Sequence, residues 1–144
     1  MIEINNLTDF LINKKFFQKF IQNVLEDESK KTYGLSIALV SQAEIKKLNK
    51  QYLGKDRATD VLAFPEGKLK TPEIFGNNIL GEIIICPEEV KKNAKDLKLG
   101  FKKELFRILT HGILHLLGYD HEKSTLAFDA MQKKENYYLE KYFK

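Results

Sequence analysis

The stretch KKELFRILTHGILHLLGYDH spans residues 102–121 and holds the three histidines of the chain, His111, His115 and His121. Apolar residues dominate its first part, which predicts a buried helix. Histidines four residues apart on a helix lie on one face, one turn apart, so His111 and His115 are expected to be neighbours. Gly118 follows the last helical turn, and glycine tolerates the left-handed conformation that ends a helix and reverses the chain towards His121.

This spacing of imidazoles is typical of a metal site. Two imidazoles one helical turn apart can bind one zinc ion at roughly 2.0–2.1 Å, and the turn can add His121 as a third ligand. Three protein ligands leave a fourth position for water, which is the pattern of catalytic rather than structural zinc. Three unrelated polar residues are the alternative, but their clustering within 11 residues favours one zinc ion per chain.

The same spacing occurs in the metzincin peptidases, whose signature is H-E-x-x-H-x-x-G-x-x-H. Gly112 stands where those enzymes carry the glutamate that takes a proton from the zinc-bound water. The ligand pattern therefore matches, whereas the peptidase mechanism does not. A general base could come from Asp120, Glu122 or Glu82, and Asp120 could instead orient an imidazole or stabilise the turn.

Strand and helix patterns alternate along the rest of the chain. Ser41 with Glu44 forms a capping box at the start of one helix, and Pro87 suits the first turn of another. We expect helices over 14–29, 41–51, 87–97, 102–117 and 125–143, strands over 2–5, 35–40, 60–64 and 80–86, and a loop over 66–78. Strands mixed with helical connections predict an α/β or α+β fold, a single domain over 1–144 in which helices cover a small sheet.

Composition predicts where the protein is located, and it leaves open whether the protein binds a polyanion. No apolar run approaches the roughly 20 residues that span a bilayer, the first residues lack a signal-peptide pattern, and the single cysteine, Cys86, cannot form an internal disulfide. We therefore expect a cytoplasmic protein without a membrane partner. The net charge of +4 fits either a solvated lysine-rich surface or a polyanionic partner such as RNA.

Only two of the 24 basic residues are arginines, the side chain preferred for bidentate phosphate contacts. Arg107 lies four residues before His111 on the same helical face, where it could contact a phosphate or form an ion pair with Glu104. Arg57 lies in a charged loop before a strand. With nearby lysines it could line a groove, or it could simply belong to an exposed turn.

Three segments resemble those of one known family. HGILHLLGYDH at 111–121 resembles the signature of the YbeY family, bacterial endoribonucleases that are specific for single strands and act in ribosomal RNA maturation. TDVLAFP at 59–65 is similar to that family's second motif. LGEIIIC at 80–86 is similar to its third motif, in which aspartate is more usual than Glu82. The resemblance runs from about Leu35 to about Glu122.

The resemblance implies a small four-stranded mixed sheet covered by about five helices, with the metal site on a helix of the C-terminal half and the turn after it. It also implies that His111, His115 and His121 are the metal ligands. The implied substrate is single-stranded RNA, in processing of the 16S ribosomal RNA 3′ end and in ribosome quality control. The implied partner is the small ribosomal subunit, and no DNA is expected.

One position departs from the family. After the tyrosine that matches Tyr52, the family usually has an arginine thought to serve catalysis, and here that position is Leu53. Arg57 could supply the missing charge. We expect zinc-assisted cleavage of an RNA phosphodiester, in which Arg57 or Arg107 stabilises charge on the phosphoryl group and Asp120 assists.

Two other functions are compatible with the histidine pattern. A zinc peptidase would share the ligands but lacks the glutamate. A non-catalytic ribosome-assembly factor would hold a structural zinc, closed by a fourth ligand such as Asp120.

Overall fold

The strand β4 (Ile79–Ile85) is apolar on both faces, and it lies inside a four-stranded sheet of order β1-β2-β4-β3. The structure is a computed structural model that describes residues 2–66, 79–119 and 124–143. β1 (Ile2–Asn6) pairs in parallel with β2 (Gly34–Leu39), and β2 pairs in parallel with β4. β3 (Val61–Pro65) is antiparallel to β4 at one edge, so the sheet is mixed, as expected.

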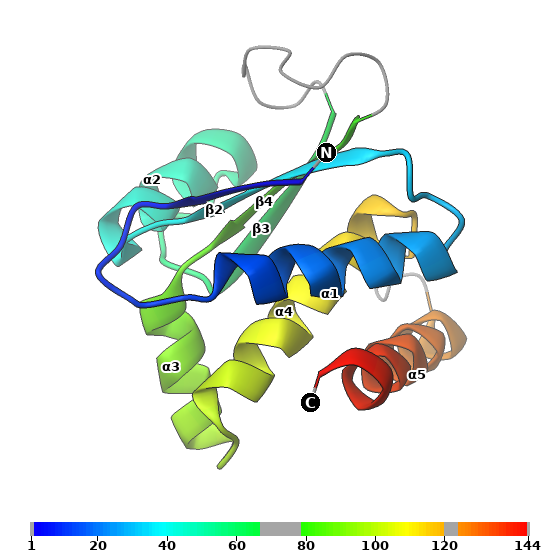
Figure 1. Ribbon diagram of the computed structural model, residues 1–144. Coiled ribbons are helices and arrows are strands. Elements are labelled where there is room, and N and C mark those ends of the chain that lie inside the picture. Colours follow the sequence, from blue (N-terminus) through cyan, green and yellow to red (C-terminus); the bar gives the residue numbers. More distant parts are fainter. Residues whose placement is uncertain (1, 67–78, 120–123, 144) are drawn as a thin grey trace.

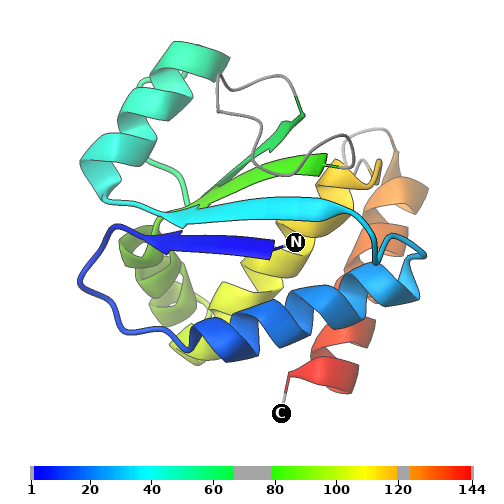
Figure 2. The same ribbon diagram turned by 45° about the horizontal axis from the view of Figure 1, so that its top comes forward.

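Five helices in the described residues cover the two faces of this sheet unequally (Figure 1). One face is covered by α2 (Gln42–Leu53) and the other by α1 (Lys14–Asp27), α3 (Pro87–Asp96), α4 (Phe101–Leu116) and α5 (Thr125–Tyr142). The turned view in Figure 2 shows α4 crossing the strands on the side opposite α2. The described residues thus form one α/β domain, and this part of the prediction is confirmed.

Alternation along β4 divides the core between the two faces. Ile83 and Ile85 pack in the large cluster with α1, α4 and α5, whereas Ile84 and Cys86 pack in the smaller cluster under α2. A strand buried on both faces reads as a continuous apolar run, which is why residues 80–86 showed no alternation in the sequence.

The ends of the helices follow the expected chemistry. The Ser41 hydroxyl accepts from the Glu44 N–H at 3.2 Å, which completes the cap of α2, and Pro87 occupies the first turn of α3. The first helix stops at Asp27 rather than at residue 29, because Ser29 adopts a left-handed φ of 61°. Of the loop expected over 66–78, residues 67–78 lie outside the described part.

In the described part of the chain, no helix combines the length and the apolar character needed to cross a membrane.

Candidate metal centre

Helix α4 carries two of the three expected metal ligands. His111 and His115 lie one turn apart on it, and Arg107 lies one turn before them, while residues on the opposite side of the helix are buried against the sheet. His111 is half-buried and His115 is exposed. His121 and Asp120 lie outside the described residues, so their roles remain predictions.

The turn expected after this helix is present at Gly118. Its φ is 103°, its N–H donates to the carbonyl of His115 at 3.1 Å, and the N–H of Tyr119 donates to the carbonyl of Leu114 at 3.0 Å. These two hydrogen bonds form a Schellman motif, which satisfies the last carbonyls of a helix and turns the chain off the helix axis. The helix end predicted at the glycine is confirmed, and the return of the chain towards His121 stays a prediction.

A carboxylate from α5 contacts the first histidine. Oε2 of Glu135 lies 2.9 Å from Nδ1 of His111, and Glu135 is only 4% exposed. A carboxylate only accepts hydrogen bonds, so Nδ1 is the ring nitrogen that donates the proton. In a neutral imidazole, Nε2 is then the nitrogen with the lone pair, which is the form of a metal-ligating histidine that is oriented by a carboxylate.

Sequence reasoning missed Glu135. The residue lies one turn after Met131 and one turn before Leu139 on α5, and all three positions are buried. A glutamate on the apolar face of an amphipathic helix was the available signal, because a buried carboxylate needs a specific partner. Its partner is 24 positions earlier in the sequence, a separation that no local pattern reveals.

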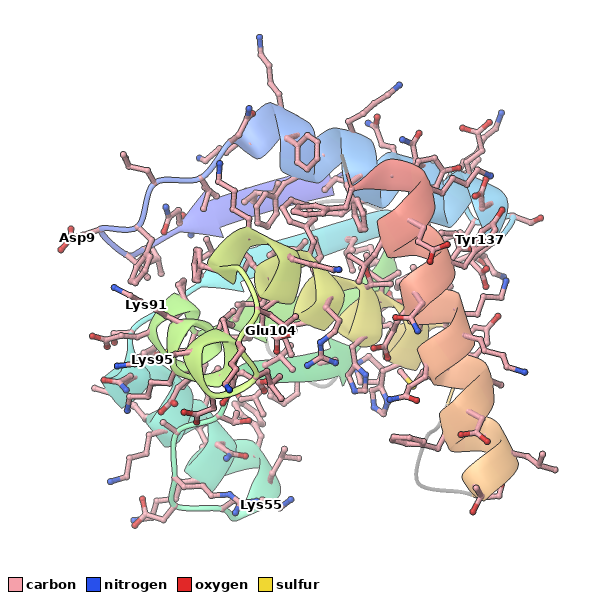
Figure 3. All side chains as sticks on the ribbon, turned by 90° about the horizontal axis from the view of Figure 1, so that it is seen from below. Asp9, Lys55, Lys91, Lys95, Glu104 and Tyr137 are labelled. Atoms are coloured by element: carbon pink, nitrogen blue, oxygen red, sulfur yellow. The ribbon has the colours of Figure 1, made fainter. Side chains whose placement is uncertain are left out.

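Arg107 lies beside the same carboxylate and is held by Glu104. Nε and one terminal nitrogen of Arg107 each donate to Glu104 at 2.7 Å, and a second terminal nitrogen lies 3.5 Å from Oε1 of Glu135. Figure 3, seen from below, shows Glu104 on α4, which packs between α3 and α5. The bidentate bond with Glu104 raises the pKa of Arg107 despite partial burial, and the charges of Glu104, Glu135 and Asp60 act in the same direction. The ion pair considered from the sequence is therefore present, while a phosphate contact by Arg107 stays a prediction.

The glycine at position 112 faces the sheet rather than the histidines. A Cβ there would lie 3.1 and 3.2 Å from two side-chain atoms of Ile83, which is fully buried in β4. These distances are shorter than ordinary van der Waals contacts in a packed core. Gly112 therefore allows α4 to approach the sheet closely, and a glutamate at this position would be directed into the core.

Glu82, unlike the other two candidate bases, lies among the residues that the structure describes. It pairs in register with Ser36 and Phe64, and its neighbour Ile83 faces α4, so Glu82 points to the opposite face of the sheet. Burial raises the pKa of its carboxyl. Asp120 and Glu122 lie outside the described residues, so the identity of the general base stays a prediction.

The loop with Arg57 is fixed through its backbone. The buried Asn49 side chain donates to the carbonyl of Arg57 at 3.0 Å, and the N–H of Lys55 donates to the carbonyl of Asn49 at 3.3 Å. The side chain of Arg57 is exposed, as is Leu53 at the end of α2. A loop anchored by these two hydrogen bonds thus carries the exposed cation, and its contact with a phosphate stays a prediction.

A half-buried carboxylate, that of Glu28, anchors the chain at the end of α4. Glu28, just after α1, accepts from the Tyr119 hydroxyl at 2.9 Å, from the Lys134 ammonium at 2.8 Å and from the Tyr138 hydroxyl. Burial opposes its ionisation, yet the hydrogen bonds from Lys134, Tyr138 and Tyr119 outweigh burial and hold the pKa of Glu28 below its ordinary value. These contacts tie Tyr119, just after α4, to Glu28 at the end of α1 and to α5.

The described donors fit a metal ion, although the set is incomplete. Among residues 2–66, 79–119 and 124–143, no group of three histidine, cysteine, aspartate or glutamate side chains is arranged to hold one. Two imidazoles at a spacing of one helical turn are described, and one of them has Nδ1 held by a carboxylate. Imidazole ligands of this kind suit zinc, nickel, copper or iron.

The comparisons with known proteins agree on one family. The family model described as "Endoribonuclease YbeY" matches residues 3–143. Among curated proteins named "Endoribonuclease YbeY", one from Persephonella marina is 42% identical over 87% of this chain and 80% of its own length, and one from Thermotoga maritima is 41% identical over 85% and 80%. A solution structure of a Thermotoga maritima protein, 36% identical in sequence, superposes with a TM-score of 0.62 and covers 98% of this chain and 91% of its own. The model match and the identities, over most of both chains, establish that this chain belongs to the endoribonuclease YbeY family.

Proposed function

We propose that this chain is a zinc-dependent endoribonuclease that cuts single-stranded RNA, with His111, His115 and His121 as the metal ligands. The observation that carries the proposal is the contact between Glu135 and Nδ1 of His111, which gives the imidazole the orientation typical of a metal ligand. Its relatives, which are named endoribonucleases, supply the class of reaction. A bound divalent ion would supply Lewis-acid stabilisation of the charge that develops on the phosphoryl oxygens.

Contacts with the phosphate and proton transfer would depend on side chains of the protein itself. Arg57 is an exposed cation on a loop whose backbone is fixed by Asn49, so it can meet a phosphate without the loop having to order first. Arg107 is held between two carboxylates, so its charge is already partly compensated and it is the weaker candidate for phosphate. Asp120 is the proposed base or orienting carboxylate.

We infer that the biological substrate is ribosomal RNA, in maturation of the 16S 3′ end and in ribosome quality control. The small ribosomal subunit would be the partner and the cytoplasm the location. The positive net charge supports a polyanionic partner.

The test measures metal and RNA cleavage on the same preparation. Elemental analysis of protein purified without added metal should find about one equivalent, mostly zinc, because three imidazoles bind one ion. A defined single-stranded RNA should be cut, and His115→Ala should lose both metal and cleavage. Lys102→Ala, an exposed position on the same helix, is the matched control and should keep both. Metal content near zero in the parent protein would overturn the proposal.

The two rival functions predict different results in this test. A peptidase would cleave unstructured protein such as casein, with loss in His111→Ala. The orientation of position 112 towards Ile83 argues against a peptidase, since no base can act from there. A non-catalytic assembly factor would bind RNA with zinc present and show no turnover.

A further inference from the structure

Glu135 is a buried carboxylate that no local sequence pattern linked to the histidines, and both of its oxygens are used. Oε2 lies 2.9 Å from Nδ1 of His111, and Oε1 lies 3.5 Å from a terminal nitrogen of Arg107. We propose that Glu135 is a positioning residue for the metal site, fixing the His111 imidazole so that Nε2 is the ligating nitrogen. The inference rests on the proposed function, because it assumes that His111 is a ligand.

A purely structural ion pair does not explain this arrangement. Arg107 already has a bidentate partner in Glu104, with both contacts at 2.7 Å, and Glu104 is fully buried. The contact of Arg107 with Glu135 is longer, at 3.5 Å. The shorter contact of Glu135 is therefore the one with His111, while Arg107 contacts the other carboxylate oxygen.

The formal charges around Glu135 also favour a bound cation beside His111. Glu104 and Glu135 contribute two negative charges and Arg107 one positive charge, so these three buried or half-buried side chains carry a net charge of −1. A buried surplus of negative charge is costly unless a cation compensates it. A divalent ion on the Nε2 side of His111 would provide that compensation, so Glu135 should strengthen metal binding through charge as well as through orientation.

The experiment measures metal affinity directly, without RNA. Zinc affinity is obtained by competition with a chromophoric chelator, and the visible absorption of the Co²⁺-substituted protein reports ligand geometry. Glu135→Gln removes the charge but keeps a side chain of the same size, and it should weaken zinc binding by about 10- to 100-fold and change the Co²⁺ spectrum. Met131→Ala, a buried position one turn earlier on α5, is the matched control. It should lower the melting temperature and leave zinc affinity within about threefold of the parent.

A double-mutant cycle separates positioning from a general effect on stability. If Glu135 acts mainly through His111, then adding Glu135→Gln to His111→Ala should cause a smaller loss of zinc affinity than Glu135→Gln causes in the parent, because only the contribution of charge remains. Unchanged affinity in Glu135→Gln would overturn the inference, as would an equal loss in Met131→Ala or a full additional loss in the double variant. If Glu135→Gln fails to fold, Glu135→Asp keeps the charge on a side chain one methylene shorter. That variant should weaken zinc binding by a smaller factor, and unchanged affinity there would equally overturn the inference.

The outcomes distinguish this inference from the proposed function. A parent protein that binds zinc and cuts RNA, with Glu135→Gln behaving like the parent, refutes only the role of Glu135. A parent protein that binds no zinc refutes the proposed metal site itself.

Discussion

Replacing Gly112 by alanine should destabilise the protein, although the same change in an exposed helix would stabilise it. Alanine exceeds glycine in helix propensity by about 1 kcal/mol. In this structure the added Cβ would lie 3.1 Å from Cδ1 and 3.2 Å from Cγ2 of Ile83. Ile83 is 0% exposed in the inner strand β4 and packs in the large core cluster, so it would have to shift against packed neighbours.

The packing cost should exceed the gain in propensity. Adding a methyl group to a well-packed core costs about 1–3 kcal/mol. Subtracting the propensity gain of about 1 kcal/mol leaves a net loss of up to about 2 kcal/mol. For a protein of this size that corresponds to a fall of up to about 8 °C in melting temperature, at roughly 2–4 °C per kcal/mol.

A thermal or urea unfolding series on four proteins tests this reasoning: the parent, Gly112→Ala, Ile83→Val and the double variant. Ile83→Val removes Cδ1, the atom nearest to the added Cβ, so alanine at 112 should cost less in that background, with a coupling energy of about 1 kcal/mol. A melting temperature that rises in Gly112→Ala would refute the reasoning. So would strict additivity in the cycle, because the cost would then not arise at Ile83.

Three further predictions concern other parts of the chain. Arg57→Ala should slow single-turnover cleavage of a defined single-stranded RNA by about 10- to 100-fold without changing zinc content, because a charge-assisted phosphate contact is worth about 1.5–3 kcal/mol. Leu53→Arg should preserve or raise the rate. A parental rate in both variants would show that this loop has no electrostatic role in cleavage. The pKa of Glu28 is lowered in the folded protein, so its stabilising contribution is present above its ordinary value of 4.5 and is lost as the pH falls through the folded value. The gap in unfolding free energy between the parent and Glu28→Gln should therefore be present at neutral pH and narrow in acid, and a gap independent of pH would contradict this. Gly81 has a φ of 152°, and a Cβ there would lie 2.2 Å from a backbone carbonyl oxygen, so Gly81→Ala should lower the free energy of unfolding by roughly 4 kcal/mol or more. Gly100 has open space around it, so Gly100→Ala should lower it by about 1 kcal/mol or less in the same denaturation assay.

The elements of the fold could be predicted because each has a local cause. The continuous apolar run at 80–86 indicated a strand buried on both faces, and the capping box at Ser41 indicated the start of α2. Gly118 indicated the end of α4, and the observed φ of 103° agrees. These signals act over a few residues, which is the range that a single sequence reveals.

The environment of the site could be predicted only in part, because it depends on contacts between distant residues. The spacing of His111 and His115 follows from helix geometry alone. Glu135 meets His111 only because α5 packs along α4, and no periodicity in either segment specifies that contact. Glu82 was one of three candidate bases by residue type, but the register of β4 turns its side chain to the face opposite α4.

The packing of α5 on α4 also sets an order of events during synthesis. His111 precedes Glu135 by 24 residues, so at roughly 5–20 residues per second the ribosome adds the carboxylate about 1–5 s after the imidazole. Until α5 has left the ribosome and docked, the nascent chain presents His111 without Glu135 to hold it. If His111 is a metal ligand, as proposed, an incomplete chain is poorly prepared to bind metal, and its imidazole becomes oriented only after translation has passed Glu135.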